Sequence, residues 1–289
     1  MSAVVRTVLT VAALTVTETS RRRVLRSLGV LTVLLLGLSA WGFSRLAVLE
    51  LGGEPVTSGE GRLTASIVLN LVMFGLSLVA ALGTTFLAGP TLAGEVESGA
   101  ALAVLARPVR RETVLLGKWC GLVAFGGGFV VLAGLAQLVV VRLTVGYWPP
   151  EPVTGLALLA AQTTVLLTLG LLLSTVVSPM ASGIVAVGLF GTTWIAGVVG
   201  GVGTALGNRS IEQVGTVSRM LLPTDGLWRG AMNAFQDPTA LLTMSGDDVA
   251  GGFPFLGPAP LTAAYLLWTA VWVVLVLGLA ALAFRRRDV

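Results

Sequence analysis

Long apolar runs, separated by short stretches of charged residues, proline and glycine, make up the hydropathy pattern of this chain. A helix needs about 20 consecutive apolar residues to cross a bilayer. Six runs reach that length, at residues 24–48, 63–88, 114–141, 153–175, 181–202 and 261–284. The pattern therefore predicts an all-α polytopic membrane protein in which residues 1–289 form a single domain of six transmembrane helices.

Basic residues, aromatics and proline mark the ends of the runs. Arginines at residues 21–26 precede the first run, and Tyr147 and Trp148, residue types typical of the membrane interface, follow the third. The second run is expected to end at Gly89 and Pro90, because proline has no N–H group for the helical hydrogen bond. Only residues 177–180 separate the fourth and fifth runs, which predicts an antiparallel helical hairpin.

Two further segments are not predicted to span the membrane. Residues 2–20 are apolar, but the run is short, rich in threonine and followed by the arginine cluster. We expect residues 1–23 to form an elbow helix in the membrane interface, with a span as the alternative. Residues 203–260 scatter charged residues among glycine and proline, and helical spacing returns within residues 212–235. This outer loop is expected to hold short interfacial or re-entrant helices and no soluble domain.

Composition and charge support a membrane protein with a defined orientation. Of the 289 residues 11% are charged, against about 25% in soluble domains. The basic residues lie at the ends of the runs and not in a surface stripe, which argues against nucleic-acid binding. The side that holds both termini, residues 90–113 with Lys118, and the turn at 177–180 carries 12 of the 18 basic and 5 of the 14 acidic residues, a net charge of +7 against −3 opposite. By the positive-inside rule this side is cytoplasmic.

The residue types present exclude several kinds of chemistry. The chain has no histidine and one cysteine, Cys120, so an internal disulfide, a zinc site of Cys and His and a histidine-based catalytic triad are excluded. The spans hold few ionisable groups at mid-depth, although ion-coupled carriers need them there. For the two polar exceptions, Asn70 and Gln137, hydrogen bonds between helices are favoured over contact with a substrate. We predict no catalytic, cofactor or metal site in this chain.

Residues 94–118 form an island of charged and helix-breaking residues in the apolar chain. Gly94, Glu95 and Glu97 suit the start of a helix, and residues 100–105 supply an apolar face. Arg107 and Pro108 end that helix, because proline disfavours helical geometry at the preceding residue. We therefore expect residues 90–112, here called the coupling segment, to include a short amphipathic helix on the cytoplasmic face.

The ordered motifs of this island resemble the first cytoplasmic loop of type-2 ATP-binding-cassette (ABC) transporter permeases. The matching residues are Gly94-Glu95, Glu97-Ser98-Gly99, Leu105, Arg107-Pro108-Val109, Arg111 and Leu116-Gly117-Lys118. Ala100 and Leu102 stand where the family usually has threonine and glutamate. Two further matches are Leu222-Pro223-Thr224-Asp225 with Leu227-Trp228-Arg229-Gly230-Ala231, and the ending Phe284-Arg285-Arg286-Arg287-Asp288-Val289.

The resemblance implies the transmembrane subunit of an ABC transporter, often an exporter, in the cytoplasmic (inner) membrane of a bacterium or archaeon. A separate ATPase subunit, which binds ATP and Mg²⁺, is implied to contact the coupling segment and the elbow, and a second permease copy or a sister permease completes twelve spans. The residues implied in ATPase coupling are Glu95, Glu97, Gly99, Arg107, Pro108, Arg110 and Arg111.

The resemblance further implies that Glu95 and Glu97 face basic groups of the ATPase. It also implies that Arg107, Arg110 and Arg111 meet lipid phosphates or the partner. The low charge of the spans favours a lipid-like or amphipathic substrate over a small ion. Two other classes stay open. One is a stand-alone channel or secondary carrier, and the other is a membrane enzyme built on outer-loop aspartates, namely Asp225, Asp237, Asp247 and Asp248.

Overall fold

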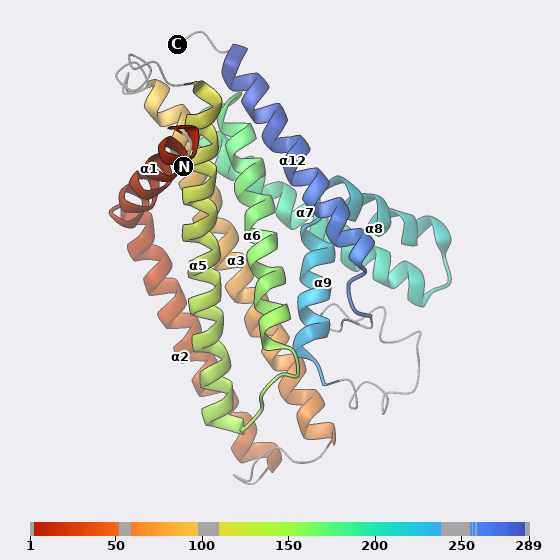
Figure 1. The fold of residues 1–289 in the computed structure, drawn as a ribbon. Helices are drawn as coiled ribbons and strands as arrows, with labels where there is room; N and C mark the ends of the chain where they lie inside the picture. Colours follow the sequence, from red (N-terminus) through yellow and green to blue (C-terminus); the bar gives the residue numbers. More distant parts are fainter. Residues whose placement is uncertain are drawn as a thin grey trace.

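The computed structural model of the chain describes residues 3–51, 59–97, 110–237, 255, 257 and 259–286. Over these residues it contains nine helices and no strand, which confirms the all-α prediction. In chain order the helices are α1 (Ala3–Ser20), α2 (Arg23–Leu51), α3 (Gly59–Glu97), α5 (Arg111–Val145), α6 (Pro152–Ser174), α7 (Pro179–Ala205), α8 (Arg209–Leu221), α9 (Thr224–Phe235) and α12 (Ala263–Arg286) (Figure 1).

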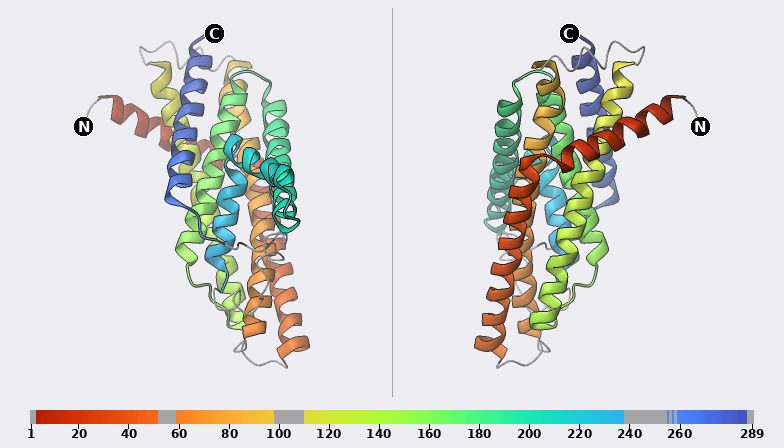
Figure 2. Two further views of the ribbon diagram at one scale, coloured as in Figure 1. Left: turned by 90° about the vertical axis from the view of Figure 1, so that its right-hand side faces the viewer. Right: turned by 90° about the vertical axis from the view of Figure 1, so that its left-hand side faces the viewer.

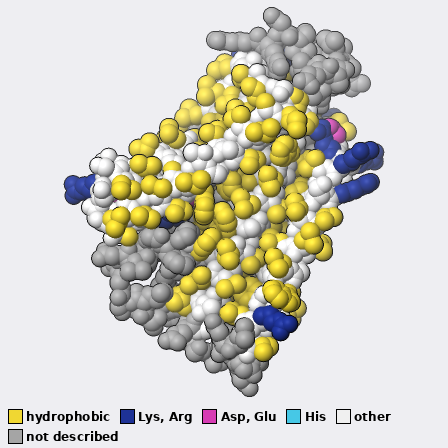
Figure 3. Space-filling view, turned by 180° about the vertical axis from the view of Figure 1, so that it is seen from behind, with side chains coloured by type: hydrophobic (Ala, Val, Ile, Leu, Met, Phe, Trp, Pro, Cys, Tyr) yellow, Lys and Arg dark blue, Asp and Glu magenta, His cyan; other side chains and the backbone are white. Residues whose placement is uncertain are grey.

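Six helices of the described ranges are long and apolar enough to cross a membrane, namely α2, α3, α5, α6, α7 and α12. They lie on the six predicted runs, so the prediction of six spans is confirmed. Pro152 and Pro179 are the first residues of α6 and α7, where a missing N–H group breaks no helical hydrogen bond. Seen from behind, apolar side chains cover the middle of the surface and basic side chains stand at its margins (Figure 3).

The expected end of the second span at Gly89 and Pro90 is wrong. Helix α3 continues through Pro90 to Glu97. Neighbouring helices and threonine side chains can compensate a proline inside a membrane helix. Here the Thr91 hydroxyl donates to the Leu87 carbonyl at 2.6 Å, and Lys118 Nζ of α5 donates to the Thr91 carbonyl at 2.7 Å.

The first residues of the coupling segment, 90–97, therefore belong to α3. Gly94, Glu95 and Glu97 were expected to open an amphipathic helix, but they belong to the last turns of α3. The structure resumes at Arg110, directly before α5. The rest of the expected amphipathic helix, including Gly99, Arg107 and Pro108, lies outside the described residues, so that helix stays a prediction.

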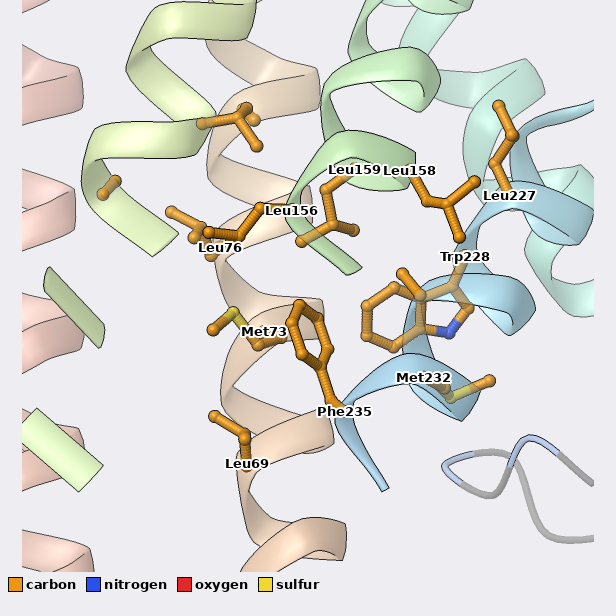
Figure 4. Packing of buried hydrophobic residues seen from close by; sticks show 14 of the residues in the cluster. Leu69, Met73, Leu76, Leu156, Leu158, Leu159, Leu227, Trp228, Met232 and Phe235 are labelled. Atoms are coloured by element: carbon orange, nitrogen blue, oxygen red, sulfur yellow. The ribbon is translucent and has the colours of Figure 1, made fainter. Parts of the chain in front are cut away.

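Helix α6 lies at the centre of the bundle, in contact with α3, α5, α7, α9 and α12. The short helix α9 returns into the bundle and packs beside α6 (Figure 4). Its Trp228 and Phe235 are fully buried, together with Leu69 and Met73 of α3. Because lipid tails are as apolar as these side chains, the burial stabilises α9 mainly through van der Waals packing.

Helices α8 and α9 confirm that the outer loop contains short helices. Asn208 caps the start of α8, where its side-chain oxygen accepts from the backbone N–H groups of Ser210 at 3.1 Å and Ile211 at 3.3 Å. The burial of α9 makes it re-entrant. In the described part of the chain between α7 and α12, two short helices therefore belong to the bundle.

The two polar side chains predicted within the spans do join helices. Asn70 Nδ2 of α3 donates to the Met232 carbonyl of α9 at 3.5 Å and to the Phe255 carbonyl at 3.1 Å, and Gln137 Nε2 of α5 donates to the Ser39 hydroxyl of α2. Both residues are buried. The prediction of hydrogen bonds between helices at Asn70 and Gln137 is confirmed.

Helix α1 confirms that a separate helix precedes the first span; its place in the membrane interface stays a prediction. It lies across α5, and its N-terminal end projects from the bundle (Figure 2). A Cβ atom built on Gly117 of α5 would lie 2.6 Å from Val11 Cβ, and one on Gly121 would lie 2.7 Å from the Ala12 carbonyl oxygen. The two glycines therefore allow backbone contact between α1 and α5.

Replacing Gly121 by leucine is expected to push α1 away from α5, because the new side chain meets backbone atoms that cannot move aside. Hydrogen–deuterium exchange of the α1 amides should become at least about tenfold faster, the change that corresponds to a loss of about 1.4 kcal/mol of local stability. Gly128→Leu on the same helix is the control, because a Cβ at Gly128 meets no atom within 4 Å. Equal exchange in the two variants would refute the proposed contact.

Candidate functional site

The predicted coupling residues Arg110 and Arg111 lie at the start of α5, beside the end of α12. Arg285 of α12 forms an ion pair with Glu112, and Arg111 Nη1 donates to the Phe284 carbonyl at 3.5 Å. A cavity of about 350 Å³ is lined by Arg110, Arg111, Glu112 and Arg285, which together carry a net charge of +2. We call the contacts of Arg111 and Glu112 with Phe284 and Arg285 the inner clamp.

The structure describes four of the seven predicted coupling residues, Glu95, Glu97, Arg110 and Arg111. It brings Arg110 and Arg111 to the same end of the bundle as the backbone of Glu95 and Glu97 at the end of α3 (Figure 1). Gly99, Arg107 and Pro108 lie outside the described residues. Sequence analysis missed Arg285 as the partner of Glu112. The only signal in the sequence was that the start of the third span and the end of the sixth carry residues of opposite charge, which could pair.

Helices α8 and α9 contain a buried group of charges, here called the arginine–aspartate triad. Asp225 in the first turn of α9 exposes 1% of its side chain. Its Oδ2 accepts from Nε of Arg219 on α8 and from Nε of Arg229 on α9, both at 3.0 Å. Arg229 Nη2 also donates to the Gly197 carbonyl of α7 at 2.6 Å. The triad therefore joins α7, α8 and α9.

Two details show how tightly the triad is built. A Cβ atom at Gly197 would collide with the Asp225 carboxylate, so a residue without a side chain is required there. Burial, followed by the charge of Arg229, lowers the pKa of the Arg219 guanidinium, while Asp225 raises it. Arginine stays protonated in proteins, so the triad carries a net charge of +1.

Three aromatic side chains of α12 satisfy the carbonyl groups at the end of α8. Tyr265 Oη donates to the Arg219 carbonyl at 3.0 Å, Trp268 Nε1 to that of Met220 at 3.2 Å, and Trp272 Nε1 to that of Leu221 at 2.8 Å. The last carbonyls of a helix have no partner within the helix. The spacing of three and four residues places all three donors on one face of α12. These aromatic contacts fix α8 to α12.

A chain of polar contacts anchors the start of α9 in the bundle. The hydroxyls of Thr193 on α7 and Thr224 on α9 are 3.1 Å apart, and Gln162 Nε2 of α6 donates to the Thr224 carbonyl at 3.3 Å. The Ser77 hydroxyl of α3 donates to Gln162 Oε1 at 2.8 Å. Four helices therefore meet at this point.

The other end of α9 is held as well. Tyr147 Oη donates to the Phe235 carbonyl at 2.7 Å, and Arg62 Nε pairs with Asp237 Oδ2 at 2.8 Å. Burial, and then the charge of Asp237, raise the pKa of the Tyr147 phenol, so it stays protonated and can donate. Contacts at both ends thus fix α9 to the bundle.

The described residues contain no group of three His, Cys, Asp or Glu side chains placed to hold a metal ion. Two outer-loop aspartates, Asp225 and Asp237, each pair with arginine, whereas Asp247 and Asp248 lie outside the described residues. The polar and charged side chains described above form contacts between helices, and ion pairs lie at both ends of the bundle.

Residues 72–289 match the family profile described as "ABC-2 family transporter protein". The chain belongs to this ABC-2 transporter family. The match begins within α3 and includes the coupling segment, both short outer helices and α12. A comparison with curated proteins found no match.

Membership of the ABC-2 family has three consequences. Together with six spanning helices it makes the chain an integral membrane protein. Permeases of the ABC-2 family are transport subunits, not catalytic ones. They work with an ABC ATPase subunit. The family predicted from the motifs of the coupling segment is therefore confirmed.

Proposed function

We propose that this ABC-2 chain is the permease subunit of an ABC exporter that moves an amphipathic substrate out of the cell. A separate ATPase subunit binds ATP and Mg²⁺ and drives the cycle. A second permease copy or a sister permease completes the transport path, and the chain itself catalyses no reaction. Export is the direction that the family resemblance implies.

The observation that carries this proposal is the inner clamp. It ties the start of α5 to the end of α12 at the point where the chain leaves the coupling segment. Helix α1 rests on α5 within three turns of that point, at Gly117 and Gly121. A force on the coupling segment or on α1 therefore reaches two spans directly.

Helix α12 offers a route from the clamp to the outer side. Its 24 residues correspond to a length of about 36 Å. Arg285 at one end belongs to the inner clamp, and Tyr265 near the other end holds α8. In our proposal, ATPase closure shifts the inner end of α12, and the aromatic contacts carry the shift to α8 and, through Asp225, to α9.

We place the protein in a cytoplasmic membrane with both termini inside. The end of α3, the start of α5 and the end of α12 lie at the same end of the bundle (Figure 1), and the positive-inside count assigns that end to the cytoplasm. Membrane lipids surround the apolar surface. In this placement Arg107, Arg110 and Arg111 meet lipid phosphates or the ATPase.

Replacing Glu95 and Glu97 together by alanine is expected to lower ATP-driven transport at least about fivefold, the lower end of typical coupling energies. The reason is the loss of two carboxylates that we place against basic groups of the ATPase. The measurement is transport by the complex in proteoliposomes, normalised to the amount of complex formed. Glu60→Ala, at the opposite end of α3, is the control, and undiminished transport by the double variant would contradict the coupling role.

A further inference from the structure

We propose that the cavity between α8, α9 and α12 binds the singly charged oxyanion headgroup of an amphipathic molecule. The headgroup comes from a bilayer phospholipid or from the transported substrate. Only the second assignment rests on the proposed function; the binding site stands on the geometry alone.

The first argument is the charge of the cavity. Two guanidinium groups share one carboxylate, so the triad keeps a net charge of +1. Both arginines reach Asp225 through Nε. In the described part of the chain the terminal nitrogens of Arg219 have no hydrogen-bond partner, and those of Arg229 have one, the Gly197 carbonyl. Several N–H donors thus remain for an anion of one charge.

The second argument is the space in front of these donors. Arg219, Arg229 and Tyr265 line a cavity of about 280 Å³, and among the described residues none of its other lining side chains is acidic. One water molecule accounts for about 30 Å³ of the liquid, so the cavity has room for a polyatomic headgroup. A phosphodiester, sulfate or carboxylate group supplies one negative charge and several acceptor oxygens.

The third argument is the depth of the cavity in the membrane. Tyr265 precedes Arg285 by 20 residues on the continuous helix α12, which corresponds to about 30 Å, the thickness of the hydrocarbon core. We place Arg285 at the inner interface, so the cavity lies toward the outer end of α12, in the outer half of the membrane. Trp268 lies one turn away from Tyr265, as expected for a residue in the interfacial aromatic belt.

The fourth argument is an apolar groove beside the cavity. The groove has a volume of about 700 Å³, and Val217, Leu221, Leu189 and Trp272 are among its lining residues. Val217 and Leu221 belong to the same turns of α8 as Thr216 and Met220, which line the cavity on another face. One end of α8 thus offers cationic donors and an apolar surface, the two features that an anionic amphiphile needs.

The test uses the full chain in nanodiscs and two anionic probes, phosphatidylglycerol and decyl sulfate, with phosphatidylcholine as the reference. Met220→Glu adds a carboxylate at the cavity without removing any member of the triad, and because Met220 is 46% exposed the change buries no new charge. We expect at least about tenfold weaker binding of both anions, because the added charge cancels the net charge of the triad. Met220→Gln is the matched neutral control and should stay within about twofold of the unchanged chain.

Each outcome decides the proposal. Binding of phosphatidylglycerol that is lost in M220E identifies the lipid as the source. Saturable stimulation of the ATPase complex by decyl sulfate, also lost in M220E, identifies the substrate as the source. Equal binding of phosphatidylglycerol and phosphatidylcholine, or equal anion binding by M220E and the unchanged chain, overturns the site. Because binding is measured without the ATPase, a chain that binds anions but shows no ATP-driven transport refutes the proposed function and not the site.

Discussion

Replacing Asp225 by asparagine is expected to lower the free energy of unfolding by about 3–5 kcal/mol, because two arginines then lose the carboxylate they share. Asp225 exposes 1% of its side chain, so water cannot take its place. The loss should separate α8 from α9 and release the start of α9 from α7. The measurement is the thermal-unfolding midpoint of the purified chain in detergent micelles.

Two controls make this expectation specific. Glu18→Gln removes an exposed carboxylate that pairs with Arg22 four residues later, and such pairs contribute only about 0.3–0.5 kcal/mol. The triple variant Arg219→Met, Asp225→Leu, Arg229→Met removes all three charges and should recover much of the midpoint. A midpoint for D225N equal to that of E18Q would contradict the role of the triad.

Reversing the charge at Arg285 is expected to reduce ATP-driven transport at least about tenfold, within the range of typical coupling energies. Glutamate at this position repels Glu112 and opens the inner clamp. Arg285 exposes 58% of its side chain, so the stability of the chain should change by no more than about 1 kcal/mol. Transport by the complex in proteoliposomes and the unfolding midpoint of the chain are measured side by side.

The reciprocal change provides the decisive comparison. Adding Glu112→Arg to Arg285→Glu restores an ion pair with exchanged charges, and transport should recover to within about twofold. Recovery of that kind separates the pair from a general effect of charge at the inner surface. Undiminished transport by R285E, or the absence of recovery in the double variant, would show that the ion pair of Arg285 and Glu112 does not couple the ATPase to transport.

The spans were predictable because each is a local property of the sequence. Six apolar runs of membrane length, with basic and aromatic residues at their ends, indicate six helices without knowledge of their contacts. The short outer helices were predictable for the same reason, since helical spacing returns within residues 212–235. The order of the motifs from Gly94 to Lys118 identified the family, because it resembles the first cytoplasmic loop of type-2 ABC transporter permeases.

The rest depends on contacts between distant residues. Pro90 is a local signal for a helix end, but α3 continues through it, and Lys118 of α5 binds the Thr91 carbonyl directly after it. The triad was missed because Asp225 was considered as an outer-loop aspartate of a possible enzyme site, and its burial between Arg219 of α8 and Arg229 of α9 depends on contacts between helices. The spacing of Tyr265, Trp268 and Trp272 was a visible signal of one helix face, but its partner, the end of α8, is not encoded in that pattern.

The candidate coupling site also combines residues that local sequence indicates with a residue that only a distant contact reveals. The sequence identified Arg111 through a motif and Arg110 as its neighbour in the charged island, and the structure added Arg285 of α12, 174 residues after Arg111. The ATPase contact of Glu95 and Glu97 stays a prediction from the resemblance. Since the match to the ABC-2 family covers residues 72–289, it includes every residue of the predicted coupling site.

The central claim is that this chain moves its substrate only when an ABC ATPase drives it. The most direct measurement compares flux of an anionic amphiphile in proteoliposomes that hold the chain alone, the chain with its ATPase and ATP, and the chain with an ATPase variant that binds but does not hydrolyse ATP. We predict flux in the second sample only. Flux through the chain alone, driven by an ion or substrate gradient, would identify a channel or a secondary carrier and contradict the account.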